Sequence, residues 1–218
     1  MAFLQSQPPR EPFLHAPGSV IGLIGVLIAI HLVVAFLPVP VEALEPFAFI
    51  PARYVEGAPA LELVLPLVSH MFLHGSFAHL LINCAWLLAF GPVVARRLGG
   101  PLFLAFFLLC GAAGALMQMA LDWGSPVAMI GASGGISGLM AASFRMMHWP
   151  GAPTGVRLVP LLSRPILVTS GLWMAVNLVF GLIGFGAGPM EMIAWQAHMG
   201  GYLFGIVAIG LFDRLRRV

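Results

Sequence analysis

Residues 101–121, "PLFLAFFLLCGAAGALMQMAL", contain no charged side chain and are apolar almost throughout. An α-helix rises about 1.5 Å per residue, so roughly 20 apolar residues are needed to cross the hydrocarbon core of a bilayer. The stretch meets that length. It therefore predicts a membrane-spanning helix.

The same pattern recurs along the 218-residue chain, at 19–37, 76–95, 131–148, 165–184 and 193–212. The whole sequence is 60% hydrophobic and 8% charged, with a mean hydropathy of +1.00. Soluble domains carry about 25% charged residues. The stretches predict an all-α membrane protein, with six transmembrane helices forming one bundle at 19–212 between short tails at 1–18 and 213–218.

Two features could suggest a secreted protein, and neither does so here. The stretch at 19–37 is as long as a full span, and no A-x-A-like cleavage site follows it, so a membrane helix is favoured over a secretory signal. Cys84 and Cys110 both lie inside predicted spans. They are interpreted as small buried residues that form neither a disulfide nor a metal site.

The arginines predict how the bundle is oriented. The chain has no lysine, so the excess of cytoplasmic positive charge must be counted on ten arginines. With six spans both termini face one side, and all but one of the arginines fall on that side: Arg10, Arg96, Arg97, Arg145, Arg157, Arg164, Arg214, Arg216 and Arg217. Only Arg53 falls opposite, where most acidic residues lie. Both termini are therefore predicted to be cytoplasmic.

The loop at 38–68 is external in this arrangement, and it is long and partly apolar. It is either an ordinary external loop or a segment lying in the membrane interface, as amphipathic surface segments do. In the second case Phe47, Phe49 and Tyr54 are the expected anchors.

Four polar side chains in the predicted spans lie at similar depth: His79 and Asn83 in the second, Ser133 in the fourth and His198 in the sixth. At 1.5 Å per residue they lie about 18 to 26 Å from the cytoplasmic arginines that follow their spans. Polar groups within spans are costly and usually functional. A transport site more often lies at the midplane, so this depth favours a pocket open to outside water.

If these side chains meet, they suit acyl transfer to water. Ser133 would be the nucleophile and His198 the general base. No acidic residue lies in a span to orient the imidazole, so the pair is predicted to act as a dyad. His79 and Asn83 lie one helical turn apart and would donate to the oxyanion. The backbone N–H of Ser133 would add another donor.

Glycines around these residues predict close helix contact. Small residues four apart allow helix backbones to approach, and Gly131, Gly134, Gly201 and Gly205 belong to such pairs near the proposed site. The repeat "GASGGISG" at 131–138 also offers a second serine, Ser137, one turn deeper. Ser133 is favoured because the start of a helix stabilises negative charge.

Three segments carry a resemblance to a known family: "SHMFLHGSFAHLLIN" (69–83), "GASG" (131–134) and "AHMGGYLFG" (197–205). In order and on the expected spans, they resemble the H-x₃-H-x₄-H-x₃-N, G-x-S-G and A-H-x-x-G-x-x-x-G signatures of the rhomboid intramembrane serine proteases. The resemblance implies that Ser133 is the nucleophile, His198 the base, and His79 with Asn83 the oxyanion donors.

The resemblance also implies cleavage of membrane-anchored proteins in or near their transmembrane segment, without cofactor or metal. The expected partners are such transmembrane proteins and the lipid bilayer, and not nucleic acid. The expected location is a bacterial inner (plasma) membrane, with the active site opening toward the outer side. Residues 184–195 would cap the site. The sequence departs from the family at Ser137, where an aromatic residue commonly packs on the catalytic histidine, and at Arg53, which follows alanine with no tryptophan near.

Other interpretations remain. Non-catalytic rhomboid-like chaperones or adaptors resemble the fold but lack the serine or the histidine, and this chain has both. A transporter would be expected to show an internal repeat, and none is found. A soluble esterase with G-x-S-x-G needs a preceding strand and a soluble sheet. His31, Gln118 and Asn177 are interpreted as packing or pore-rim groups.

Overall fold

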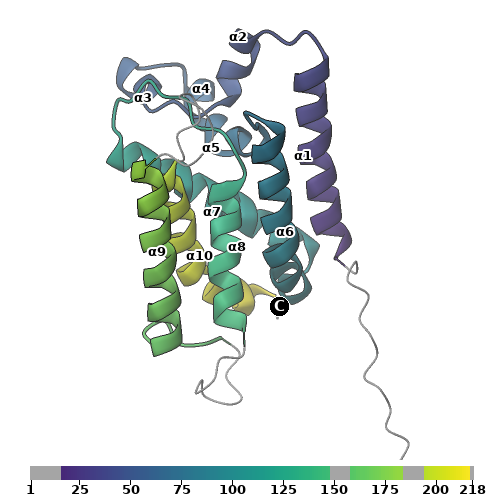
Figure 1. Ribbon diagram of the computed structural model, residues 1–218, viewed down its shortest axis with the longest axis vertical. Coiled ribbons are helices and arrows are strands. Elements are labelled where there is room, and N and C mark those ends of the chain that lie inside the picture. Colours follow the sequence, from purple (N-terminus) through teal and green to yellow (C-terminus); the bar gives the residue numbers. More distant parts are fainter. Residues whose placement is uncertain (1–15, 148–157, 184–193, 217–218) are drawn as a thin grey trace, which may run out of the picture.

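The computed structural model describes residues 16–147, 158–183 and 194–216, and within them the protein is helical (Figure 1). The long helices are α1 (Gly18–Phe36), α6 (Phe77–Leu98), α7 (Gly100–Leu121), α8 (Ser133–Met146), α9 (Arg164–Ile183) and α10 (Trp195–Leu215). The short ones are α2 (Val41–Leu44), η1 (Glu45–Phe47), α3 (Ala52–Glu56), α4 (Ala60–Val64), α5 (Pro66–Ser69) and η2 (His70–Phe72).

The long helices coincide with the predicted apolar stretches to within three residues at each end. Among the described residues, α1, α6 and α7 are long and apolar enough to cross a membrane. The prediction of a membrane protein built as a helical bundle is therefore confirmed. The number of crossings and the side on which the termini lie stay predictions. The expected tail at 1–18 and the expected cap at 184–195 fall largely outside the described residues.

Helix α8 is shorter than a full span, at 14 residues, because it lies inside the bundle. Every residue from Gly134 to Ser143 is buried. Figure 1 shows α8 between its neighbours, with α1 and α9 at opposite edges of the bundle. A helix covered by protein on all sides needs no long apolar surface for lipid. Its glycine- and serine-rich sequence suits that position.

The central helices α7, α8 and α10 contact each other through backbone atoms. A Cβ placed on Gly201 of α10 would overlap the carbonyl of Gly134 in α8, and one on Gly205 would lie 2.5 Å from the Cα of Gly138. A Cβ on Gly114 of α7 would lie 2.6 Å from the carbonyl oxygen of Ala197. These helices pack as closely as they do because glycine removes the side chain between them. Gly134 and Gly138 of α8 and Gly201 and Gly205 of α10, at which these two helices meet, belong to the G-x-x-x-G pairs found in the sequence.

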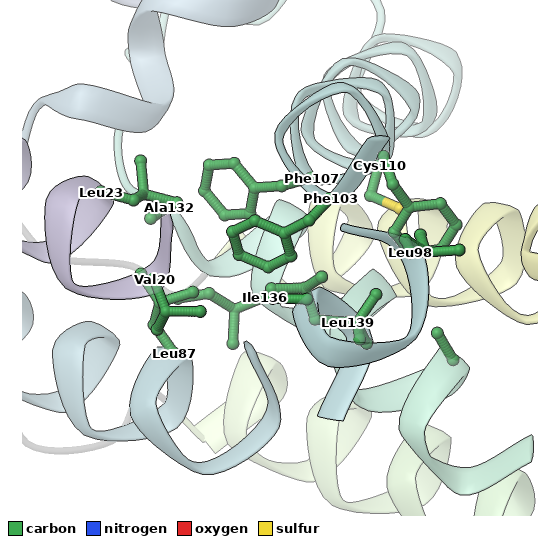
Figure 2. Packing of buried hydrophobic residues seen from close by; sticks show 14 of the residues in the cluster. Val20, Leu23, Leu87, Leu98, Phe103, Phe107, Cys110, Ala132, Ile136 and Leu139 are labelled. Carbon is green, nitrogen blue, oxygen red and sulfur yellow. The ribbon is translucent and has the colours of Figure 1, made fainter. Parts of the chain in front are cut away.

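A second packing region joins α1, α6, α7 and α8 through larger side chains (Figure 2). Phe103 and Phe107 of α7 and Ile136 of α8 are buried in it, together with Val20 and Leu23 of α1. Lipid tails are as apolar as these side chains, so burial from water does not hold the helices together in a bilayer. Close van der Waals contact does.

The short helices α2 to α5 gather at the end of the bundle where α6 and α8 begin (Figure 1). Phe49 of this loop pairs with Met129 in both directions, N–H to carbonyl, at 3.0 and 2.8 Å. Its side chain is fully buried against Tyr54 and His70. Phe49 therefore packs inside the protein and is not an interfacial anchor, whereas Phe47 is 43% exposed.

The opposite end of the bundle holds the start of α1 at Gly18 and the end of α10 at Leu215 (Figure 1). There Arg97 of α6 donates two hydrogen bonds to Asp213 of α10, at 2.7 and 3.1 Å. Arg145 of α8 donates to the carbonyl of Ile206 in α10 at 2.8 Å. A bidentate pair of this kind sets helix positions with little freedom. Arginine hydrogen bonds therefore hold the end of the bundle that is predicted to be cytoplasmic, whereas the packed first loop covers the other end.

Candidate active site

Ser133 and His198 form a hydrogen bond between α8 and α10. The Ser133 Oγ lies 2.7 Å from Nε2 of His198. Ser133 is the first residue of its helix, and His198 lies in the first turn of α10. The glycine contact described above brings the two helices close enough for this. At this distance the hydroxyl can donate its proton to the imidazole when Nε2 carries the lone pair.

The second ring nitrogen of His198 is also bonded. Nδ1 lies 2.7 Å from Oδ1 of Asn177, which comes from α9 and is buried. The amide nitrogen of Asn177 donates to the carbonyl of Trp173 at 2.9 Å. The expectation of a two-residue arrangement, with Asn177 as a packing group, missed this contact. A polar residue inside a span was the available signal, but the sequence does not show which helix it faces.

Gly131 brings His79 next to Ser133. Its φ of +119° is a conformation that other residues rarely adopt, and its N–H donates to the carbonyl of His70 at 2.9 Å. A Cβ at this position would lie 2.7 Å from His79 Nε2 and 3.9 Å from Ser133 Oγ. His79 Nε2 and Ser133 Oγ therefore border the same small space beside Gly131.

His79 is held there by the start of its helix. Ser76, the residue before α6, accepts a hydrogen bond from the backbone N–H of His79 at 3.2 Å. This is an N-terminal cap, and it fixes where the helix begins. At the start of α8, the N–H groups of the first turn have no acceptor within the helix, and no side chain caps them. The start of α6 is thus capped by a side chain, whereas N–H groups without a side-chain cap lie beside Ser133 at the start of α8.

Asn83 is buried one turn deeper than His79 on α6. Its Nδ2 donates to the backbone carbonyl of His79 at 2.9 Å. A primary amide carries two N–H groups, so the second stays available for another acceptor. The described contacts of Asn83 do not include Ser133, and its part in the site is an expectation from the sequence.

Ser137, the second serine of the repeat, is 3% exposed inside α8. Gly134 lies between it and Ser133 and faces Ala197 of α10. The serine bonded to His198 is the one at the helix start. The structure thus separates the two copies of the repeat, which look alike in sequence.

A pocket of about 320 Å³ lies beside the site, between α1 and the first loop. Its lining is mainly apolar and includes His31 and His74, with Glu45 among the loop residues. The ring of His74 meets that of His79 edge to face, with centroids 5.1 Å apart, and the His31 ring lies 6.5 Å beyond. Within the described part of the chain, no three histidine, cysteine or acidic side chains are placed to hold a metal ion.

His70 and His74, which lie between the first loop and α6, are electrically neutral at ordinary pH. Burial lowers the pKa of His70 to about 4, partly offset by its hydrogen bond to the Pro66 carbonyl at 2.7 Å. Burial, helped by the neighbouring rings of His79 and His31, lowers the pKa of His74 to about 3. Desolvation disfavours the charged imidazolium in both cases.

Fold and site together define a helical membrane protein with a serine–histidine pair at the start of two central helices. The chain belongs to the rhomboid family, because residues 62–214 match the model of the Rhomboid domain. Helix α1 and most of the first loop precede the matched range.

A relative from Danio rerio is "Presenilin-associated rhomboid-like protein A, mitochondrial". It is 28% identical over 166 residues, which are 72% of this chain and 40% of the relative. The chain therefore aligns with less than half of the relative's length.

Proposed function

We propose that this protein is an intramembrane serine endopeptidase that uses Ser133 as nucleophile and His198 as general base. The observation that carries the proposal is the 2.7 Å contact between Ser133 Oγ and His198 Nε2 in a member of the rhomboid family. A family fold alone does not establish activity. The proposal therefore rests on the site.

The reaction follows from the hydrogen bond. Ser133 Oγ attacks the carbonyl carbon of the scissile peptide bond while His198 Nε2 takes the hydroxyl proton. The tetrahedral intermediate collapses, the C–N bond breaks, and His198 returns the proton to the leaving amine. Water then attacks the carbonyl carbon of the acyl-enzyme and loses a proton to His198 Nε2. The bond between the acyl carbon and Ser133 Oγ breaks, His198 returns the proton to Oγ, and the product carboxylic acid leaves.

His79, Asn83 and the N–H of Ser133 are the proposed donors to the developing oxyanion. Preorganised donors at this point are commonly worth 10²- to 10³-fold in kcat. The support comes from the space shared by His79 Nε2 and Ser133 Oγ beside Gly131. The start of α8 adds the positive end of a helix dipole.

The proposed substrates are membrane-anchored proteins cut in or near their transmembrane segment. The support is that α8 and α10, which carry Ser133 and His198, pack against α7, a helix long and apolar enough to cross a membrane. We propose that the site opens toward the outer face, on the basis of the arginine distribution. The name of the Danio rerio relative places that protein in mitochondria, which gives no support to a bacterial plasma membrane for this chain.

A second candidate is a non-catalytic rhomboid-like membrane chaperone or adaptor. It is favoured by the name of the relative, which says "rhomboid-like" and specifies no protease activity. The two candidates differ in one measurable property, the reactivity of Ser133.

The test is labelling of the purified, folded protein with a fluorophosphonate, alongside cleavage of a single-span substrate. Wild type and Ser137→Ala should be labelled and active, whereas Ser133→Ala and His198→Ala should show neither property. Folding of each variant is checked by its thermal unfolding. Labelling that persists in Ser133→Ala would overturn the assignment, and an unreactive wild type would favour the non-catalytic candidate.

A further inference from the structure

We propose that Asn177 is a positioning residue that completes a Ser133–His198–Asn177 triad. The inference rests on the proposed function, because it concerns how His198 is oriented for proton transfer. It starts from two bonds at the same imidazole: Nε2 to Ser133 Oγ and Nδ1 to Asn177 Oδ1, each at 2.7 Å. The three side chains come from three different helices, α8, α10 and α9.

The orientation of the Asn177 amide is set by a second contact. Its Nδ2 donates to the carbonyl of Trp173, one turn earlier on α9. That carbonyl can only accept, so it selects the nitrogen of the amide. The oxygen is left facing His198. Asn177 is 4% exposed, so no exchange of partners with solvent competes with this arrangement.

The amide oxygen in turn selects one tautomer of His198. A neutral imidazole has one N–H and one lone pair, and Asn177 Oδ1 can only accept. The N–H must therefore be on Nδ1. The lone pair of Nε2 then faces the hydroxyl of Ser133, which is the arrangement that a general base needs. The other tautomer would set two lone pairs against each other at Asn177.

Asn177 acts on orientation and not on charge. When His198 takes the proton of Ser133, the proton moves from Oγ to Nε2, and the Nδ1–H bond to Asn177 remains in place. Asn177 neither gains nor loses a proton in this step. A neutral amide fills the same position in cysteine–histidine–asparagine sites on other folds.

The facing surfaces of α9 and α10 hold Asn177 in register. Seven residues earlier on α9, Ser170 Oγ lies 2.9 Å from the hydroxyl of Tyr202, which is four residues after His198 on α10. Trp173 stacks on the Tyr202 ring, with centroids 6.4 Å apart. Two polar contacts therefore join the same helix pair. Only the one at Asn177 reaches the catalytic histidine, so Ser170 provides a matched control.

The first experiment compares kcat and KM of purified Asn177→Leu, Asn177→Asp and Ser170→Ala with the wild type. Leucine keeps the branched arrangement of heavy atoms and removes the acceptor, so kcat should fall about tenfold or more with KM unchanged. Asp retains an acceptor oxygen and should recover part of the loss. Ser170→Ala should stay within about twofold. The rate of fluorophosphonate labelling should follow kcat.

The second experiment reads the tautomer directly, by ¹⁵N spectroscopy of histidine-labelled protein with His198 assigned by its loss in His198→Ala. The proton should be on Nδ1 in wild type and in Ser170→Ala. It should shift toward Nε2 in Asn177→Leu. A wild-type proton on Nε2, or an unchanged signal in Asn177→Leu, would overturn the inference.

The kinetic and ¹⁵N experiments together distinguish a failure of the triad from a failure of the proposed protease. If Ser133→Ala is inactive while Asn177→Leu matches wild type in kcat and tautomer, the triad fails and the protease remains. If wild type neither cleaves nor reacts, the protease fails. The ¹⁵N signal then still decides whether Asn177 orients His198. Equal losses in Asn177→Leu and Ser170→Ala would reduce Asn177 to helix packing and overturn the proposal.

Discussion

His198 and His31 lie in the same bundle but in different kinds of surroundings. Both ring nitrogens of His198 are hydrogen-bonded, to partners on two other helices. His31, on α1, is 5% exposed and has no hydrogen-bond partner for either nitrogen within the described residues. It packs edge to face on Phe77, with centroids 4.5 Å apart. Burial therefore does not distinguish the two histidines, whereas the hydrogen bonds that fix the His198 ring do.

The difference follows from how the helices meet. α8 and α10 contact through glycine backbones, so polar side chains at their ends are forced to within bonding distance. α1 packs through Val20, Leu23 and Leu27, which keep its backbone farther away. A pocket remains beside it. Four predictions test this contrast.

The largest effect is expected at the glycine contact. Gly201→Ala places a methyl group into the carbonyl of Gly134, so α8 and α10 must separate and the Ser133–His198 bond must lengthen. Overpacking of this kind costs about 1 to 3 kcal/mol. Activity should be nearly lost and the thermal midpoint should fall. Gly25→Ala on α1 is the control, because a Cβ there meets nothing within 4 Å. Equal behaviour of the two variants would contradict the packing argument.

The next effect is expected at Gly131. Alanine there must adopt a φ near +119° and would displace the His79 ring. We expect kcat to fall at least tenfold, because the site would lose a proposed oxyanion donor. The fluorophosphonate labelling rate and kcat are the measurements. Wild-type values in Gly131→Ala, at a normal thermal midpoint, would remove His79 from the site.

A smaller effect concerns pH and stability. The pKa of His74 is lowered to about 3 and that of His70 to about 4, against about 6.5 in an unfolded chain. The unfolded state therefore binds protons first as pH falls. The free energy of unfolding should therefore be highest, as far as these two groups are concerned, above about pH 6.5. It should decrease as the pH falls from there toward pH 4.

Thermal unfolding in detergent at pH 7.5 and pH 5 measures this decrease. His74→Phe keeps an aromatic ring and removes one titrating group, so the difference between the two midpoints should shrink. It should not vanish, because His70 remains. A pH dependence that is unchanged in His74→Phe would show that this ring is not kept neutral by burial.

The smallest effect is expected at His31, the other member of the comparison. His31→Phe retains the edge-to-face contact with Phe77 and lacks only the ring nitrogens, which have no partner in the described structure. Cleavage rate should stay within about twofold of wild type. A strong loss of activity would mean that His31 acts through His74 and His79, and the contrast with His198 would then be wrong.

Much of the architecture could be predicted from the sequence. Hydropathy located all six long helices, because a run of about 20 apolar residues has few alternatives to a membrane helix. Counting residues along those helices put Ser133, His198 and His79 at one depth, and the structure has the first two hydrogen-bonded. The glycine spacing predicted which helices meet closely.

Other features needed the tertiary structure. Depth along a span says nothing of which way a side chain faces around the helix axis, so Asn177 could not be distinguished from a packing group. Its contact with His198 depends on the rotation of α9 against α10. The backbone pairing of Phe49 with Met129 joins two loops with no shared pattern in sequence. Length and hydropathy determine where a helix lies along the membrane normal, whereas its neighbours and its rotation are decided by packing among all the helices at once.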